Sequence, residues 1–101
     1  MSANKMSTSI PWYSTEQDYK EILELVPPSE SAKALPYKDF VAYLEKLERG
    51  VALGGQFPVR VEIKADAVKA WCKDNNQAFC RKSISEYSAI KMMEKIRTGN
   101  N

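Results

Sequence analysis

The residue types that carry most acid–base and metal chemistry are scarce in this chain. It has no histidine, the commonest general base and metal ligand. Its two thiols, Cys72 and Cys80, are eight residues apart, which permits a disulfide but is too few soft ligands for a zinc site. Arg81 and Lys82 follow Cys80 and would favour its thiolate. We expect two reduced thiols and no catalytic residue, cofactor or metal site.

Two pairs of carboxylates have the spacing of an acid–base pair on a helix. Glu21 and Glu24 are three residues apart, as are Glu45 and Glu48. Such spacing puts both carboxylates on one face of a helix. Both pairs lie in stretches that also carry lysine or arginine, such as Arg49, which is typical of a solvated charged face. The sequence therefore predicts a protein that is not an enzyme.

Length and composition indicate a small domain that self-association would help to stabilise. The chain has 101 residues, of which 44% are hydrophobic, and a net charge of +2. We expect a flexible segment over residues 1–9, one domain over 10–98 and a frayed end at 99–101. Residues 1–9 lack the apolar run of a secretory signal, and no stretch approaches the roughly 18 apolar residues of a membrane span. A cytoplasmic protein that does not insert in membranes is the expectation.

Residues 57–64 give the clearest strand pattern. Val59, Val61 and Ile63 alternate with charged residues, which is typical of a strand with one buried face. A strand cannot stand alone, because its backbone groups must be paired. The partner is either an N-terminal stretch such as residues 7–10 or the same strand in a second copy.

The same strand is the candidate interface of a homodimer. Val59, Val61 and Ile63 are the candidate strand-pairing residues, and antiparallel pairing around Val61 would create a two-fold axis. Pro58 has no N–H, so the strand edge that bears it is less able to extend the sheet. A Val61→Lys change is expected to weaken such a dimer.

The remaining chain predicts helices. The fold class is α+β, mostly α, with about four helices and one clear strand between the second and the third. Capping boxes are expected at Ser14 with Gln17 and at Ser83 with Glu86. The first helix should end at Pro27, the second should run from Pro36 to about Gly50, and the third should cover residues 65–76. The inner side of the last helix is expected to carry Tyr87, Ile90, Met93 and Ile96.

An alternative function is nucleic-acid binding by the C-terminal helix pair. Helices over 65–76 and 83–97 with a connection of about six residues are similar to a helix-turn-helix, whose usual turn is shorter. Residues 65–101 carry seven Lys or Arg and four Asp or Glu, a net of +3. The candidate contacts are Arg81, Lys82, Lys91 and Lys95.

A second alternative is a small-ligand pocket lined by Trp12, Tyr43 and Trp71. Residues 10–13, 59–63 and 70–72 together resemble a family of small uncharacterised bacterial proteins, over about residues 10–95. Two asparagines at 75–76 replace that family's glycine. The resemblance implies a bacterial cytoplasmic protein and no established activity. The leading hypothesis is a non-enzymatic interaction or regulatory module, homodimeric or bound to another protein.

Overall fold

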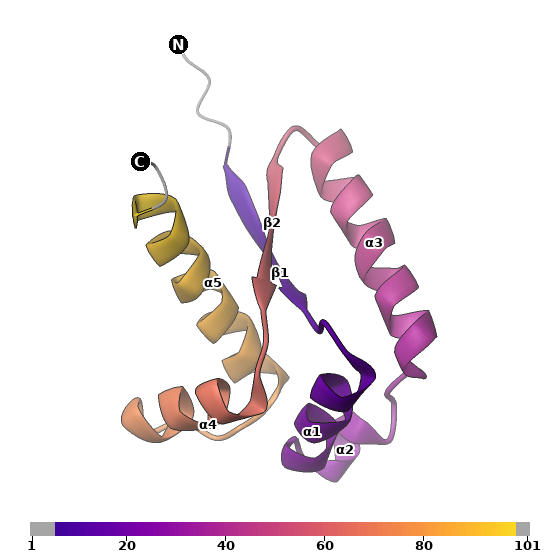
Figure 1. Ribbon diagram of the computed structural model, residues 1–101, viewed down its shortest axis with the longest axis vertical. Coiled ribbons are helices and arrows are strands. Elements are labelled where there is room, and N and C mark those ends of the chain that lie inside the picture. The colour runs from indigo at the N-terminus through magenta and orange to yellow at the C-terminus, as the bar shows by residue number, and fades with distance from the viewer. Residues whose placement is uncertain (1–5, 99–101) are drawn as a thin grey trace.

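The computed structural model describes residues 6–98, which are mostly helical and include a small two-stranded sheet (Figure 1). The elements, in order, are β1 (Ser7–Trp12), α1 (Glu16–Leu25), α2 (Pro28–Ser31), α3 (Tyr37–Leu53), β2 (Phe57–Glu62), α4 (Ala65–Asp74) and α5 (Arg81–Thr98). The α+β class, mostly α, is confirmed. The expected count was wrong: the described residues form five helices and two strands, because α2 was missed and β1 was named only as one possible partner of the clear strand.

The two strands pair in parallel. Ser7 lies opposite Phe57 and Trp12 lies opposite Glu62. The Phe57 N–H donates to the Met6 carbonyl at 2.9 Å, and the Ile63 N–H donates to the Trp12 carbonyl at 2.8 Å. Parallel neighbours require a long crossover, which α1, α2 and α3 supply.

The strand prediction was therefore right about β2, and its partner is the N-terminal alternative. The segment expected to be flexible over residues 1–9 overlaps β1 from Ser7 onward, because pairing with β2 satisfies the backbone of these polar residues. Its first five residues, and the frayed end expected at 99–101, lie outside the part of the chain that the structure describes.

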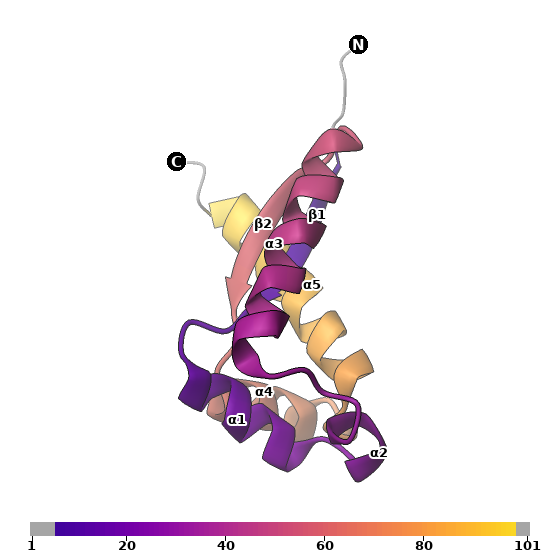
Figure 2. The same cartoon turned by 90° about the vertical axis from the view of Figure 1, so that its right-hand side faces the viewer.

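The long helices α3 and α5 lie on opposite sides of the sheet (Figures 1 and 2). Each contacts both strands. The shorter helices α1, α2 and α4 gather at the end where both strands finish. Ile10 and Ile63 are completely buried between these layers, and Val61 is nearly so.

An aromatic cluster joins the end of β1 to α1 and α3. Tyr13 makes edge contacts with Tyr19 and Phe40, with ring centroids 5.7 and 5.4 Å apart. The Tyr37 hydroxyl donates to the Tyr13 carbonyl at 2.7 Å, and the Tyr19 hydroxyl donates to the Leu35 carbonyl at 2.6 Å. Burial raises the pKa of Tyr13 and of Tyr19, so both stay protonated and can donate.

Both capping predictions were wrong. Thr15, one residue after Ser14, caps α1 and accepts from the Asp18 N–H at 3.1 Å. The second predicted cap, Ser83, is not at a helix start: α5 begins at Arg81, so Ser83 lies inside its first turn. The Ser83 hydroxyl donates to the Ala78 carbonyl, in the connection before the helix. This bond to the connection replaces the predicted bond to the helix backbone.

The inner side of α5 was also predicted wrongly, apart from Tyr87. The buried residues of α5 are Ser83, Ile84, Tyr87, Ser88 and Met92, whereas Ile90, Met93 and Ile96 remain 42%, 54% and 41% exposed. Tyr87 packs edge-on against Trp71 of α4, with ring centroids 6.1 Å apart. That contact leaves the apolar residues at 93 and 96 without cover from the described residues.

Candidate functional site

A two-stranded sheet has two outer edges, and in this fold they differ. Backbone groups of successive residues point to opposite edges of a strand. Because Met6 and Trp12 direct their carbonyls to β2, Ser7, Ser9 and Pro11 direct theirs away from it. By the same alternation, Pro58, Arg60 and Glu62 direct their backbone groups to the outer edge of β2.

The outer edge of β2 is poorly suited to adding a strand. Pro58 has no N–H to offer there. The Lys95 ammonium, from α5, donates to the Arg60 carbonyl at 3.4 Å. This edge is therefore blocked at one end by a missing donor and near its middle by a side chain.

Arg60 also ties β2 to α3 on one face of the sheet. Its guanidinium forms a two-pronged pair with Glu48, at 2.6 and 2.9 Å, and lies 3.6 Å from the centre of the Trp12 ring. The Arg60 hydrogen bond lowers the pKa of Glu48, so the carboxylate stays ionised. Glu48 therefore does not belong to a solvated charged face, as was expected of the Glu45 and Glu48 pair, but joins α3 to β2.

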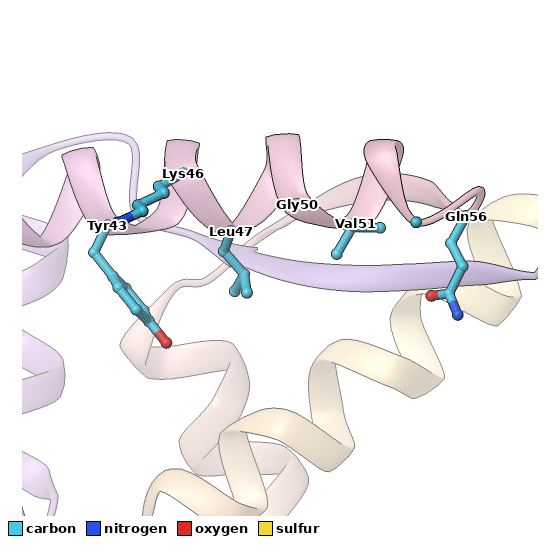
Figure 3. Close-up of a pocket in the computed structure, with 7 residues that line it drawn as sticks. Tyr43, Lys46, Leu47, Gly50, Val51 and Gln56 are labelled. Atoms are coloured by element: carbon cyan, nitrogen blue, oxygen red, sulfur yellow. The ribbon is translucent and has the colours of Figure 1, made fainter.

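Among residues 6–98, no strand pairs with the outer edge of β1, and a hollow lies beside it on the α3 side. A cavity of about 560 Å³ there is lined by seven residues, namely Tyr43, Lys46, Leu47, Gly50, Val51, Gly54 and Gln56. Figure 3 shows Tyr43, Leu47 and Val51 extending from one side of α3. Tyr43 and Leu47 are 51% and 38% exposed, so they form a neighbouring pair of exposed apolar side chains in this lining.

A second cavity, of about 460 Å³, continues the hollow toward the end of β1. It includes Ser9 and Pro11 of β1 together with Ile84 and Ser85 of α5. Its lining shares Tyr43 and Leu47 with the first cavity. We call the hollow formed by the β1 edge, the Tyr43 side of α3 and the Ser85 side of α5 the β1 groove.

The charges that line the β1 groove are mostly positive. Lys46, Lys33 and Arg81 are cations in its lining, and Glu30 is the acid. The Glu30 carboxylate accepts from the Arg81 backbone N–H at 2.9 Å, which joins α2 to the start of α5. The charges thus concentrate at the rim and at the α2 end, and the centre of the groove is apolar.

Polar side chains gather where the two strands end. The Ser14 hydroxyl donates to Glu62 at 2.8 Å, and the Lys64 ammonium lies 2.9 Å from Asp18 and 3.3 Å from Glu62. Hydrogen bonding to Lys64 lowers the pKa of Asp18, and hydrogen bonding to Ser14 and Lys64 lowers that of Glu62. Both carboxylates are thus held ionised and accept only, and the cluster ties the end of β2 to α1.

The two thiols lie on either side of the Ser83 hydroxyl. Cys72 is buried and its thiol is 3.8 Å from the Ala78 carbonyl, whereas Cys80 is half-buried with its sulfur 3.5 Å from the Ser83 oxygen. Burial raises the pKa of Cys72, and the Ser83 hydrogen bond lowers that of Cys80. Both are free thiols, and one is in the core, as expected.

The predicted strand-pairing residues lie mostly inside a single copy. Val61 and Ile63 are core residues and Val59 is half-buried. A lysine at 61 would therefore unfold the domain, so Val61→Lys cannot report on a dimer. One edge of β2 is taken by β1 and the other is blocked, so β2 cannot pair with its own copy around Val61 in this arrangement. The homodimer itself stays a prediction.

The basic residues proposed for nucleic acid do not converge. Arg81 and Lys82 stand at the start of α5, whereas Lys91 and Lys95 stand in its last two turns. Lys91 pairs with Glu94 at 3.4 Å, and Lys95 reaches the β2 backbone. No observation favours this function over the others.

The three aromatic residues proposed for a ligand pocket are separated. Tyr43 lines both cavities, but Trp12 lies under Arg60 and Trp71 packs against Tyr87. The sequence analysis missed the β1 edge. A signal for it exists, since Thr8, Ile10 and Trp12 alternate with Ser7, Ser9 and Pro11.

Comparison with known proteins finds no matching family model, no matching curated protein and no matching solved structure. The resemblance to small bacterial proteins stays a prediction. Among residues 6–98, no group of three or more Cys, Asp or Glu side chains is placed to hold a metal ion. Within the same range, no helix combines the length and apolar character that crossing a bilayer requires.

Proposed function

We propose that the protein is a non-enzymatic interaction module that binds an extended polypeptide along the open edge of β1. The observation that carries this proposal is the combination of an unpaired strand edge with apolar cavities beside it. Backbone groups at such an edge supply affinity, and neighbouring pockets supply side-chain selectivity.

The energetics support binding at β1 rather than at β2. The outward N–H groups of Ser7 and Ser9 can pair with an added strand, whereas at the outer edge of β2 the Arg60 carbonyl already accepts from Lys95. Tyr43 and Leu47 would lose their exposed apolar surface on binding, at about 25 cal/mol for each Å² removed from water.

The test compares three tagged baits in a cell lysate supplemented with an untagged copy of the chain. The baits are the wild type, Gly50→Glu in the β1 groove and Ala42→Glu, an exposed α3 residue that lines neither cavity. Support is a polypeptide, the untagged copy included, that is retained by the wild type and by Ala42→Glu but lost from Gly50→Glu. Equal recovery of every polypeptide on the three baits overturns the proposal.

A further inference from the structure

The sheet of this protein is smaller than its helical layers. Two strands alone rarely make an independently stable sheet, and proteins normally cover or block an open edge. Here α3 and α5 flank the edge of β1 without covering it, and exposed apolar side chains face the gap. The occupant must therefore supply both a strand for the edge and apolar surface for the two helical walls.

We propose that this occupant is a second copy of the chain, with β1 paired antiparallel to the partner's β1 about a two-fold axis at Ser9. The inference rests on the proposed function and names its partner. The result is a four-stranded sheet in which the two β1 strands are central and the blocked edges of β2 are outermost. Every remaining edge would then carry Pro58 and the Lys95 contact.

The sequence of β1 fits this register. Ser9 lies opposite the partner's Ser9, so the two residues exchange a pair of N–H to carbonyl bonds. Two residues away, the Ser7 N–H meets the carbonyl of the partner's Pro11. Pro11 has no N–H, and this position at the end of the ladder is where a strand tolerates proline. Symmetry thus pairs each available donor with an acceptor.

The spacing of the helices also fits a second copy. Strands in a sheet are about 4.8 Å apart, and α3 contacts both β1 and β2. A helix centred over the two strands would lie about one strand spacing from the new axis. The two α3 helices would then be about 10 Å apart, which is a normal helix packing distance. On the other face, α5 also contacts both strands.

The side chains on the α3 wall are suited to this contact. Tyr43, Leu47 and Gly50 lie on the groove side of α3 at helical spacing. Gly50 lines the first cavity, and a Cβ added there would meet nothing within 4 Å, so there is open space beside it. Antiparallel packing places the partner's Tyr43 near this hollow and brings the two Leu47 side chains together. The Tyr43 ring of each copy would thus fill the space beside Gly50 of the other copy.

The α5 wall offers a similar stripe. Ser85 lines the groove, and Ala89, Met93 and Ile96 follow it at positions four, eight and eleven residues later, which share its side of the helix. Met93 and Ile96 are 54% and 41% exposed. A free extended peptide would cover the strand edge but would leave these outer apolar residues in water. A second copy related by the two-fold axis would cover the groove sides of both α3 and α5.

The test measures molar mass by sedimentation equilibrium across the micromolar range, using the full chain. The mass of one copy is 11.5 kDa, so a dimer has twice that, 23 kDa. We expect the wild type and Ala42→Glu to form the dimer and Gly50→Glu to be monomeric, with a dissociation constant raised by about 100-fold or more. Glutamate improves on glycine in a helix interior, so Gly50→Glu should keep its helical circular dichroism. Leu47→Glu, measured beside it, gives a second disruption of the same wall.

The outcomes separate this inference from the proposed function. Loss of the dimer in both groove variants, with amide exchange at Ser9 slowed only in the dimer, supports the second copy. A wild type that is monomeric throughout the range overturns it. If that monomer still retains another polypeptide that Gly50→Glu loses, the proposed function stands. A dimer that both groove variants keep overturns the inference and points to a different surface.

Discussion

Replacing Ser88 by alanine should stabilise the protein, although the residue is completely buried. Ser88 lies on the inner side of α5 and is 0% exposed. Within the described residues its hydroxyl has no hydrogen-bond partner. A buried polar group left unpaired costs about 1–3 kcal/mol, because it loses its bonds to water and gains none. The alanine variant removes this cost.

The expected gain follows from three contributions. Removing the unpaired hydroxyl contributes at least about 1 kcal/mol. The better helix propensity of alanine adds about 0.5 kcal/mol. The loss of one oxygen atom leaves little space and subtracts only a small part of this gain. We therefore expect the free energy of unfolding to rise by about 1.5 kcal/mol, which raises the melting temperature by roughly 8 °C.

The measurement is urea-induced unfolding followed by tryptophan fluorescence. All variants are compared at one protein concentration, because association shifts apparent stability. The matched control is Ser85→Ala, an exposed serine of the same helix, which shares the propensity gain but removes no buried hydroxyl. Because Ser85 lines the β1 groove, the comparison uses a concentration at which the chain is monomeric. A Ser88→Ala variant that is less stable than the wild type, or that gains no more than the control, would refute this reasoning.

The ion cluster, the thiols and the turn before β2 give three further tests. The pKa of Asp18 is lowered by Lys64, so its contribution to stability is present above about pH 4 and is lost as pH falls through the lowered value; Asp18→Asn should flatten this acid limb of the unfolding free energy. Cys80 should be alkylated about tenfold or more faster than Cys72, as read by mass spectrometry, because its thiolate is favoured and it is less buried. Gly55→Ala should cost about 1 kcal/mol in urea unfolding, because the residue has φ +86°.

Each of these tests has a matched control. For Asp18→Asn the control is Asp39→Asn, in the first turn of α3, which removes a carboxylate outside the ion cluster. Its unfolding free energy should fall at acid pH as that of the wild type does. Ser83→Ala should slow alkylation of Cys80, and equal rates for the two thiols would contradict the assignment. Gly50→Ala is helical with open space around it, so it should stabilise by up to about 1 kcal/mol, and a loss similar to that of Gly55→Ala would contradict the turn argument.

Local patterns predicted β2 and the four main helices well. The alternation of Val59, Val61 and Ile63 is strong because charged residues separate them, and the helices have clear apolar periodicity or proline boundaries. The α2 turn was missed because four residues are too few to show a period, and its segment has the proline and serine content of a loop.

Tertiary contacts decided what the patterns could not. The polar residues of β1 become a strand only because β2 lies beside them, and β2 is far away in the sequence. Tyr87 is a core residue as predicted, but Ile84, Ser88 and Met92 share its buried side of α5 in place of the predicted Ile90, Met93 and Ile96. The candidate site is therefore the part of the molecule that was hardest to predict, because the β1 groove is bounded by β1, α3 and α5, which are separate in the chain.

The parallel register of the sheet has a consequence for the order of folding. Every β1–β2 pair joins residues 50 apart, since 57 − 7 and 62 − 12 are both 50. Closing a loop of 50 residues costs about 2 kcal/mol more than closing one of 5, and contacts so distant form slowly. During synthesis on the ribosome, β1 emerges before β2, and about 50 more residues must be made before β1 can pair with its partner strand. The open edge of the protein is thus assembled late, around a strand that was made early.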